Sequence, residues 1–446
     1  MSEAILPLEP GRDRLMRLDS AVVLKRFFHL ERALVIACGG WVPAVHRLES
    51  KQLLSRCAWE DAMTADALRA RVFELRYPDR ALDVGDEVEL VTLFDAALHA
   101  PGGAALLHAL AALFTPALRR AYERYLEASD DVADGPTRRF LELAVREKAA
   151  QERDLATAAG AELELRPEQG ASAQRWVSKL ARRLERWGGL GLEPRGAGIA
   201  PPGASAEVDA VIAPGEPFTL AQVPARDPHY FRCTFYWPDA VDPSYPYGEG
   251  LRLQVRSAVS HLNEVWAVET AGAILQGLAQ PLGWEFIFDA ARWLYDESRH
   301  MTMGKVRLEW WGLEPSGVPL GSYIYDACRD QDPVHRLGML AFFETKNIGR
   351  KRERAEEFGA LGDRTSQRDM DFDWADEAIH AGYGRRWLRR ALQAAGDDPE
   401  SWPQVVARCE QLVQQRVARA TDDEKRDIRA CADALIERAE AAATRR

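Results

Sequence analysis

The chain has 446 residues, of which 47% are hydrophobic and 28% charged, and its formal net charge is -11. This length exceeds a single hydrophobic core and predicts two domains of an ordinary soluble protein. The acidic balance argues against nucleic acid as the main partner, because phosphate recognition needs a sustained basic surface. With no N-terminal apolar signal and no apolar run of about 18 residues, we expect neither secretion nor membrane spanning.

The six cysteines stand at positions 38, 57, 233, 328, 409 and 431, and no two of them form a CxxC pair. This spacing argues against a zinc ribbon and against a cysteine-ligated iron site. It indicates reduced thiols, so we expect a cytoplasmic protein.

The N-terminal part, from about residue 20 to residue 187, places apolar side chains three and four positions apart, as amphipathic helices do. Glycine and proline breaks near residues 39–40, 77–79, 101–103 and 134–136 leave four or five helices. We therefore predict a helical bundle over residues 1–190.

The next segment, residues 191–249, is interrupted by proline and glycine and then becomes rich in aromatic residues. It is longer than a simple tether. We predict a linker to about residue 216, followed by an extended aromatic arm that packs on a domain and shapes substrate access.

Helical periodicity returns over residues 250–446. We place helices at residues 250–279, 284–311, 333–360, 370–395 and 402–440, with a long connection over 312–332. Two antiparallel pairs joined by one long crossover are the connectivity of a ferritin-like bundle. The predicted fold is therefore all-α, with two helical-bundle domains, the second a ferritin-like four-helix bundle with an extra C-terminal helix.

Two of the nine histidines occur in the pattern Asp-Glu-x-x-His, at Asp296-Glu297-Ser298-Arg299-His300 and Asp376-Glu377-Ala378-Ile379-His380. On a helix, a glutamate and a histidine three residues apart lie on one face and can reach one metal ion. The preceding aspartates can orient the histidines of the facing helix, Asp296 serving His380 and Asp376 serving His300. His261 is assigned to the helix surface or to a supporting role.

Two further glutamates stand at matching distances from these motifs. Glu264 precedes Glu297 by 33 residues, and Glu344 precedes Glu377 by 33 residues. The midpoints fall on the turn signals near Gly283 and Gly362, so each pair should lie level in its helical hairpin. Glu269 is an alternative to Glu264, because its midpoint with Glu297 is Gly283, but Glu264 restores the equal spacing.

One glutamate from each of two helices and one Glu-x-x-His from each of the other two form the ligand set of a di-iron or di-manganese centre. The segment 374–384, Trp-Ala-Asp-Glu-Ala-Ile-His-Ala-Gly-Tyr-Gly, resembles the fourth helix of bacterial ferritin-like families, and residues 250–395 resemble the ferritin-like di-metal carboxylate superfamily. The resemblance implies two metal sites, with Glu297 and Glu377 positioned to bridge. One site would use Glu264, Glu297 and His300, and the other Glu344, Glu377 and His380.

The N-terminal half repeats parts of this pattern without its ligands. Glu31 corresponds loosely to Glu264, and residues 59–64 correspond to 295–300 with Thr64 in the place of the histidine. Glu147 likewise has Ala150 three residues later. The half resembles a degenerate ferritin-like bundle, and we expect it to bind no metal and to serve packing, dimerisation or shielding.

The pattern predicts a non-haem di-iron enzyme, an oxidase or oxygenase that activates O2 on a small-molecule substrate. The cofactor would be two iron ions, with manganese or a mixed manganese–iron pair as alternatives. An external electron donor is needed, because the chain has neither a GxGxxG fingerprint nor a cysteine-ligated cluster. The alternatives are a ferroxidase or metal-handling protein, a manganese catalase or peroxidase acting on peroxide, and a non-catalytic helical interaction protein. A homodimer is one expected assembly.

Overall fold

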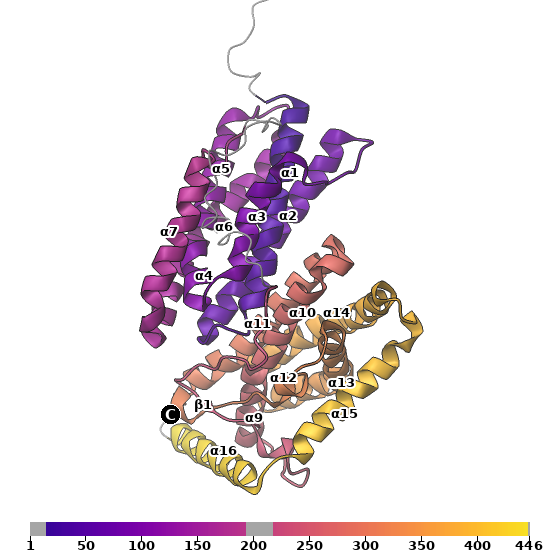
Figure 1. The fold of residues 1–446 in the computed structure, drawn as a ribbon. Coiled ribbons are helices and arrows are strands. Elements are labelled where there is room, and N and C mark those ends of the chain that lie inside the picture. The colour runs from indigo at the N-terminus through magenta and orange to yellow at the C-terminus, as the bar shows by residue number, and fades with distance from the viewer. Residues whose placement is uncertain (1–14, 193–216, 445–446) are drawn as a thin grey trace, which may run out of the picture. The chain divides into compact units, whose positions relative to one another are not determined.

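The computed structural model describes residues 15–192 and 217–444, and over these residues it is helical apart from two short strands (Figure 1). The predicted all-α fold is confirmed. The described residues fall into two compact units, unit 1 within Met1–Ala37 and Glu60–Phe218, and unit 2 within Cys38–Trp59 and Thr219–Arg446. Most of the predicted linker, residues 193–216, lies outside the described residues.

Unit 1 is a helical bundle in which α4 and α5 pack along α6, and α7 packs on α4. A π-helical segment at Leu110–Phe114 joins α4 to α5 without a turn. The bounds of its elements, including the parts of α1 and α2 assigned to unit 2, are α1 Arg17–Trp41, α2 Leu48–Arg76, η1 Gly85–Glu87, α3 Val88–Asp95, η2 Ala96–His99, α4 Gly103–Ala109, α5 Thr115–Ala128, α6 Gly135–Leu165, η4 Pro167–Gln169 and α7 Gly170–Arg186.

Unit 2 contains two antiparallel helix pairs, α10 on α11 and α13 on α14, with α9 also against α11. The pairs turn at Gly283 and Gly362, whose positive φ angles of 76° and 75° suit glycine. The bounds are β1 Phe231–Arg232, η5 Pro238–Ala240, α9 Leu251–Asn263, α10 Val265–Leu282, α11 Trp284–Trp310, η6 Pro315–Gly317, β2 Pro319–Leu320, α12 Tyr323–Ala327, α13 Pro333–Ala360, α14 Arg364–Ala395, η7 Pro399–Ser401, α15 Trp402–Ala418 and α16 Asp422–Ala443.

The first helix predicted for unit 2 is divided at Glu264, between α9 and α10. Next to the division, the Asn263 side-chain amide donates to the carbonyl of Val259 at 2.8 Å, a local bond of the kind that competes with helical backbone bonds. The same amide donates to the Pro319 carbonyl at 2.9 Å, and its oxygen accepts from the Gly321 N–H at 2.7 Å. Asn263 therefore ties β2, which lies in the crossover, to the joint between the two helices.

The predicted boundary at residue 190 needs one correction, because residues 38–59 belong to unit 2. Lys51 is fully buried and its Nζ lies 3.0 Å from the Glu269 carboxylate on α10. The Trp59 ring packs against Phe288 on α11, with centroids 5.3 Å apart. These long-range contacts have no periodic signal in the sequence, so the helix pattern alone assigned the segment to the N-terminal bundle.

Two other predictions for unit 2 change in detail. The aromatic arm contributes β1, which pairs in parallel with β2, so Phe231 lies opposite Pro319. The predicted C-terminal helix over 402–440 is two helices, because Thr421 and Glu424 form a capping box that starts α16.

Among the described residues, no helix is long and apolar enough to cross a membrane.

Candidate metal centre

The six predicted ligands come together inside the four long helical segments of unit 2. Glu297, Glu344, Glu377 and His380 each offer a ligand atom within 4.8 Å of the others, and so do Glu264, Glu297 and His300. Five of the six side chains are buried, whereas the Glu264 side chain is 16% exposed. The two groups share Glu297, as two adjacent metal positions would require. Their role as ligands remains a prediction.

Both histidines are oriented from behind by an aspartate on the facing helix. His300 Nε2 lies 3.2 Å from Asp376 Oδ2, and His380 Nε2 lies 3.4 Å from Asp296 Oδ2. An N–H at Nε2 leaves Nδ1 of each ring as the basic atom. The Nδ1 atoms face the carboxylates, at 3.2 Å from His380 to Glu297 and at 3.5 Å from His300 to Glu264.

Two arginines balance the charge of these aspartates. Arg299 donates to Asp296 at 2.6 Å and to Asp376 at 3.0 Å. Arg292 donates to Asp296 at 2.6 Å and lies 3.5 Å from Asp376. The aspartates are therefore already paired, so they support the histidines rather than add to the anionic charge of the centre.

Trp293 holds the other side of the cluster. Its indole N–H lies 3.1 Å from Glu297 Oε1 and 3.1 Å from Glu344 Oε1. Its ring stacks on His380 with the centroids 5.3 Å apart. One side chain thus positions three of the predicted ligands.

The two halves of the centre are related by a constant offset of 80 residues. Glu264, Asp296, Glu297 and His300 correspond to Glu344, Asp376, Glu377 and His380. Four residues after each histidine is a glycine, Gly304 or Gly384, where a Cβ would lie within 3 Å of the neighbouring helix, α9 or α13. These glycines let the helices approach closely enough for the opposing ligands to meet.

The centre suits a divalent cation. Nδ1 of His300, Nδ1 of His380 and Oε2 of Glu264 are buried and have no hydrogen-bond partner among the described residues. Burial raises the pKa of Glu264 to about 8 and, together with neighbouring Glu297, that of Glu344 to about 7. Carboxylate oxygens and imidazole nitrogens are donors that iron(II) and manganese(II) accept.

Two residues at the centre, Asp373 and Lys351, were not predicted as part of it. His261 was predicted only as a surface or supporting residue. Asp373 is fully buried one turn before Glu377, and His261 Nε2 lies 2.9 Å from Asp373 Oδ2. Lys351 is buried two turns after Glu344, with its Nζ 2.6 Å from both Asp373 Oδ1 and Glu377 Oε1. The available sequence signals were the four-residue spacing of Asp373 from the predicted ligand Glu377 and the seven-residue spacing of Lys351 from the predicted ligand Glu344. Burial lowers the pKa of His261 to about 3, so this buried histidine is neutral and supports Asp373.

Glu269, the alternative to Glu264, lies elsewhere. Its buried carboxylate is paired with Lys51 at 3.0 Å and with the Arg226 guanidinium. It joins none of the candidate metal groups found among the described residues. The geometry therefore favours Glu264.

Unit 1 contains a buried charged cluster. It lies at positions that correspond, in the sequence comparison of the two halves, to the predicted ligands of unit 2. Lys148 Nζ lies 2.8 Å from Glu31 Oε2 and 2.7 Å from Asp61 Oδ1. Tyr122 donates to Glu31, and Gln151 donates to Asp61 at 2.9 Å. The pair Lys148 and Gln151, one residue beyond the expected Glu147 and Ala150, takes the place of a Glu-x-x-His.

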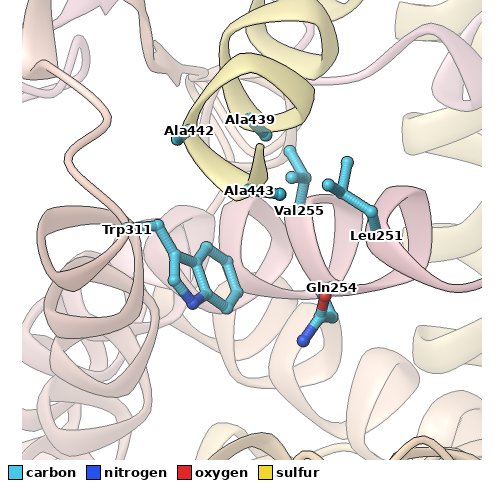
Figure 2. A pocket seen from close by; sticks show the side chains of 7 residues that line it. All are labelled: Leu251, Gln254, Val255, Trp311, Ala439, Ala442 and Ala443. Carbon is cyan, nitrogen blue, oxygen red and sulfur yellow. The ribbon is translucent and has the colours of Figure 1, made fainter. Parts of the chain in front are cut away.

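A separate pocket of about 210 Å³ lies between α9 and α16 and is closed on one side by Trp311 (Figure 2). Figure 2 shows Leu251 and Val255 facing Ala439 and Ala443 across it. Gln254 is the one polar side chain among those that line it, and it also donates to Asp363 at 2.7 Å. The pocket therefore offers apolar contact but no chemical group for catalysis.

The comparison with known families gives one match, which covers residues 220–434 and is described as "Protein of unknown function (DUF455)". The matched region includes every predicted ligand, together with Asp373 and Lys351. No curated protein and no solved structure matches the chain. The case for a function therefore depends on the geometry of the site.

Proposed function

We propose that unit 2 is a ferritin-like di-metal domain and that the chain is a non-haem di-iron oxidase or oxygenase acting on a small-molecule substrate. One observation carries the proposal. The Nδ1 atoms of His300 and His380 are buried, form no hydrogen bond among the described residues and face carboxylates, at 3.5 Å from His300 to Glu264 and at 3.2 Å from His380 to Glu297. A cation bound between these nitrogens and carboxylates would give both buried Nδ1 atoms a partner.

When bound, two iron(II) ions would supply the electrons that reduce O2. The first metal position would use Glu264, Glu297 and His300, and the second Glu344, Glu377 and His380. Glu297 belongs to both groups of donor atoms and could serve both positions. Four carboxylates balance the charge of two divalent ions, so the occupied centre would be close to neutral.

The surrounding residues would hold the ligand side chains in the orientation that metal binding needs. Asp296 and Asp376 fix the histidine tautomers, and Trp293 holds Glu297 and Glu344 by hydrogen bonds. The burial of five ligands excludes bulk water, which strengthens the electrostatic interactions inside the centre and protects a reactive oxidant from quenching. Substrate oxidation would need a reductant from outside the chain.

The first test is the metal content per chain after anaerobic loading with Fe(II) or Mn(II) and removal of excess metal. We expect about two ions in the wild type and their loss in Glu297→Ala and His380→Ala. Glu309→Ala is the matched control, because Glu309 is exposed on α11 and pairs with Lys305. A wild-type protein that binds no metal specifically would refute the proposal.

The second test separates the possible reactions. The iron-loaded protein should consume O2 in a single burst that external reductant renews and that Glu297→Ala abolishes. Continued oxidation of iron far beyond the bound amount would instead identify a ferroxidase. Sustained release of O2 from hydrogen peroxide by the manganese form would identify a catalase.

A further inference from the structure

Lys351 places a positive charge inside the proposed metal centre. Its side chain is 7% exposed, and its ammonium nitrogen lies 2.6 Å from Asp373, 2.6 Å from Glu377 and 3.5 Å from Glu264. Glu377 and Glu264 are predicted ligands from different metal positions. The ammonium therefore binds carboxylates that metal ions would need.

Lys351 and Asp373 together correspond to Trp293 in the other half of the centre. The 80-residue offset pairs Trp293 with Asp373, each one turn before a glutamate of a Glu-x-x-His motif. Trp293 donates to Glu297 and Glu344, whereas Lys351, held by Asp373, donates to Glu377 and Glu264. The indole N–H is neutral and compatible with bound metal, but the ammonium adds a charge that repels it.

Unit 1 shows what a buried lysine does where the metal ligands are missing. Lys148 is 1% exposed and neutralises Glu31 and Asp61. Thr64 stands at the position that corresponds to His300, and Gln151 lies one residue beyond Ala150, which occupies the other histidine position. A lysine thus places a positive charge beside two buried carboxylates.

We propose that the Lys351 ammonium occupies the place of metal ions, a role called here the placeholder role. In the metal-free centre it pairs with Glu264 and Glu377, and it releases both carboxylates when metal ions bind. This inference rests on the proposed di-metal function. In the metal-bound form Lys351 remains paired with Asp373. Asp373 is not one of the six predicted ligands, and its carboxylate lies 2.9 Å from His261 Nε2. The negative charges of five carboxylates are then balanced, those of four glutamates by two divalent ions and that of Asp373 by the Lys351 ammonium.

The proposal has two opposite consequences. Without Lys351, the metal-free protein keeps several buried carboxylates and loses their internal cation, so it should be less stable. The same change removes a charge that competes with metal, so metal should bind more tightly. A lysine that merely supported the ligands, as Trp293 does, would lower both stability and metal affinity when removed.

The experiment compares wild type with Lys351→Met and with Lys346→Met, an exposed lysine on the same helix. For each protein, the thermal midpoint of the metal-free form and the anaerobic affinity for Mn(II) against a chelator are measured. We expect Lys351→Met to melt several degrees lower without metal and to bind Mn(II) about tenfold more tightly, the coupling typical of charges in contact. Lys346→Met should change neither.

If wild type binds Mn(II) and Lys351→Met binds it equally or more weakly, the placeholder role is wrong but the di-metal centre stands. Failure of both proteins to bind Mn(II) would instead refute the di-metal centre. If Lys351→Met folds only when Mn(II) is present, that result supports the proposal directly. If it does not fold at all, Lys351→Gln, whose amide retains hydrogen bonds to the carboxylates, is used for the same two measurements.

Discussion

His300 on α11 and Asp376 on α14 are joined across the bundle, with Nε2 of the imidazole 3.2 Å from Oδ2 of the carboxylate. His380 and Asp296 make the reciprocal contact at 3.4 Å. Each Asp-Glu-x-x-His motif therefore orients the histidine of the other motif. The same pair of contacts links the two helices and holds the two rings in place.

Asp376→Asn should weaken metal binding without unfolding unit 2. The amide no longer favours the tautomer that exposes His300 Nδ1, and such supporting changes typically cost about ten- to a hundredfold in metal affinity. Titration with Mn(II) checks this, and Asp371→Asn, an exposed aspartate on the same helix, is the control. Unchanged affinity in Asp376→Asn would show that Asp376 does not orient His300.

Glu264→Gln and Glu269→Gln should have different effects. Glu264→Gln should reduce the metal content, because Glu264 faces His300 in the centre. Glu269→Gln should keep the metal but lower the free energy of unfolding by about 3 kcal/mol, because Lys51 and Arg226 lose their buried counter-charge. Metal analysis and urea unfolding of both variants check the assignment, and the reverse pattern would make Glu269 the ligand.

Lys148→Met should destabilise unit 1 and leave the metal content unchanged. Glu31 and Asp61 would remain buried without a cation, which typically costs about 3–5 kcal/mol. Urea unfolding measures the loss, and Arg153→Met, at an exposed position on α6, is the control. A simultaneous loss of bound metal would mean that unit 1 contributes to the metal site.

Stability should fall as the pH decreases towards 5, and His29 should contribute to the fall. Burial lowers the pKa of His29 from 6.5 to about 4, with Arg32 and Lys25 acting in the same direction against the Leu82 carbonyl and Asp83. The unfolded chain therefore binds the proton first, so this contribution is complete above pH 6.5 and is lost as the pH falls towards 4.

Between pH 7.5 and pH 5, His29 should account for a loss of about 2 kcal/mol. His29→Gln should flatten the pH dependence of the free energy of unfolding by that amount. Urea unfolding at several pH values measures the difference. An identical slope in wild type and variant would show that His29 keeps an ordinary pKa.

The sequence predicted the helices and the convergence of the six candidate ligand residues because both depend on local regularities. Helical period places Glu297 and His300 on one face, and the midpoint of Glu264 and Glu297, between residues 280 and 281, lies close to the Gly283 turn. Lys351 and Asp373 could not be found in this way, since their meeting depends on how α13 and α14 pack. The grouping of residues 38–59 with unit 2 depends on similar long-range contacts, such as that of Lys51 with Glu269.

The joint between α9 and α10 gives one predicted ligand a different backbone setting from the other five. Glu297, His300, Glu344, Glu377 and His380 each project from the interior of a continuous helix, whereas Glu264 occupies the residue between two helices. Its side chain is also the most exposed of the six. If the centre binds metal as proposed, Glu264 can change its position with less disturbance of the bundle than the other five residues can.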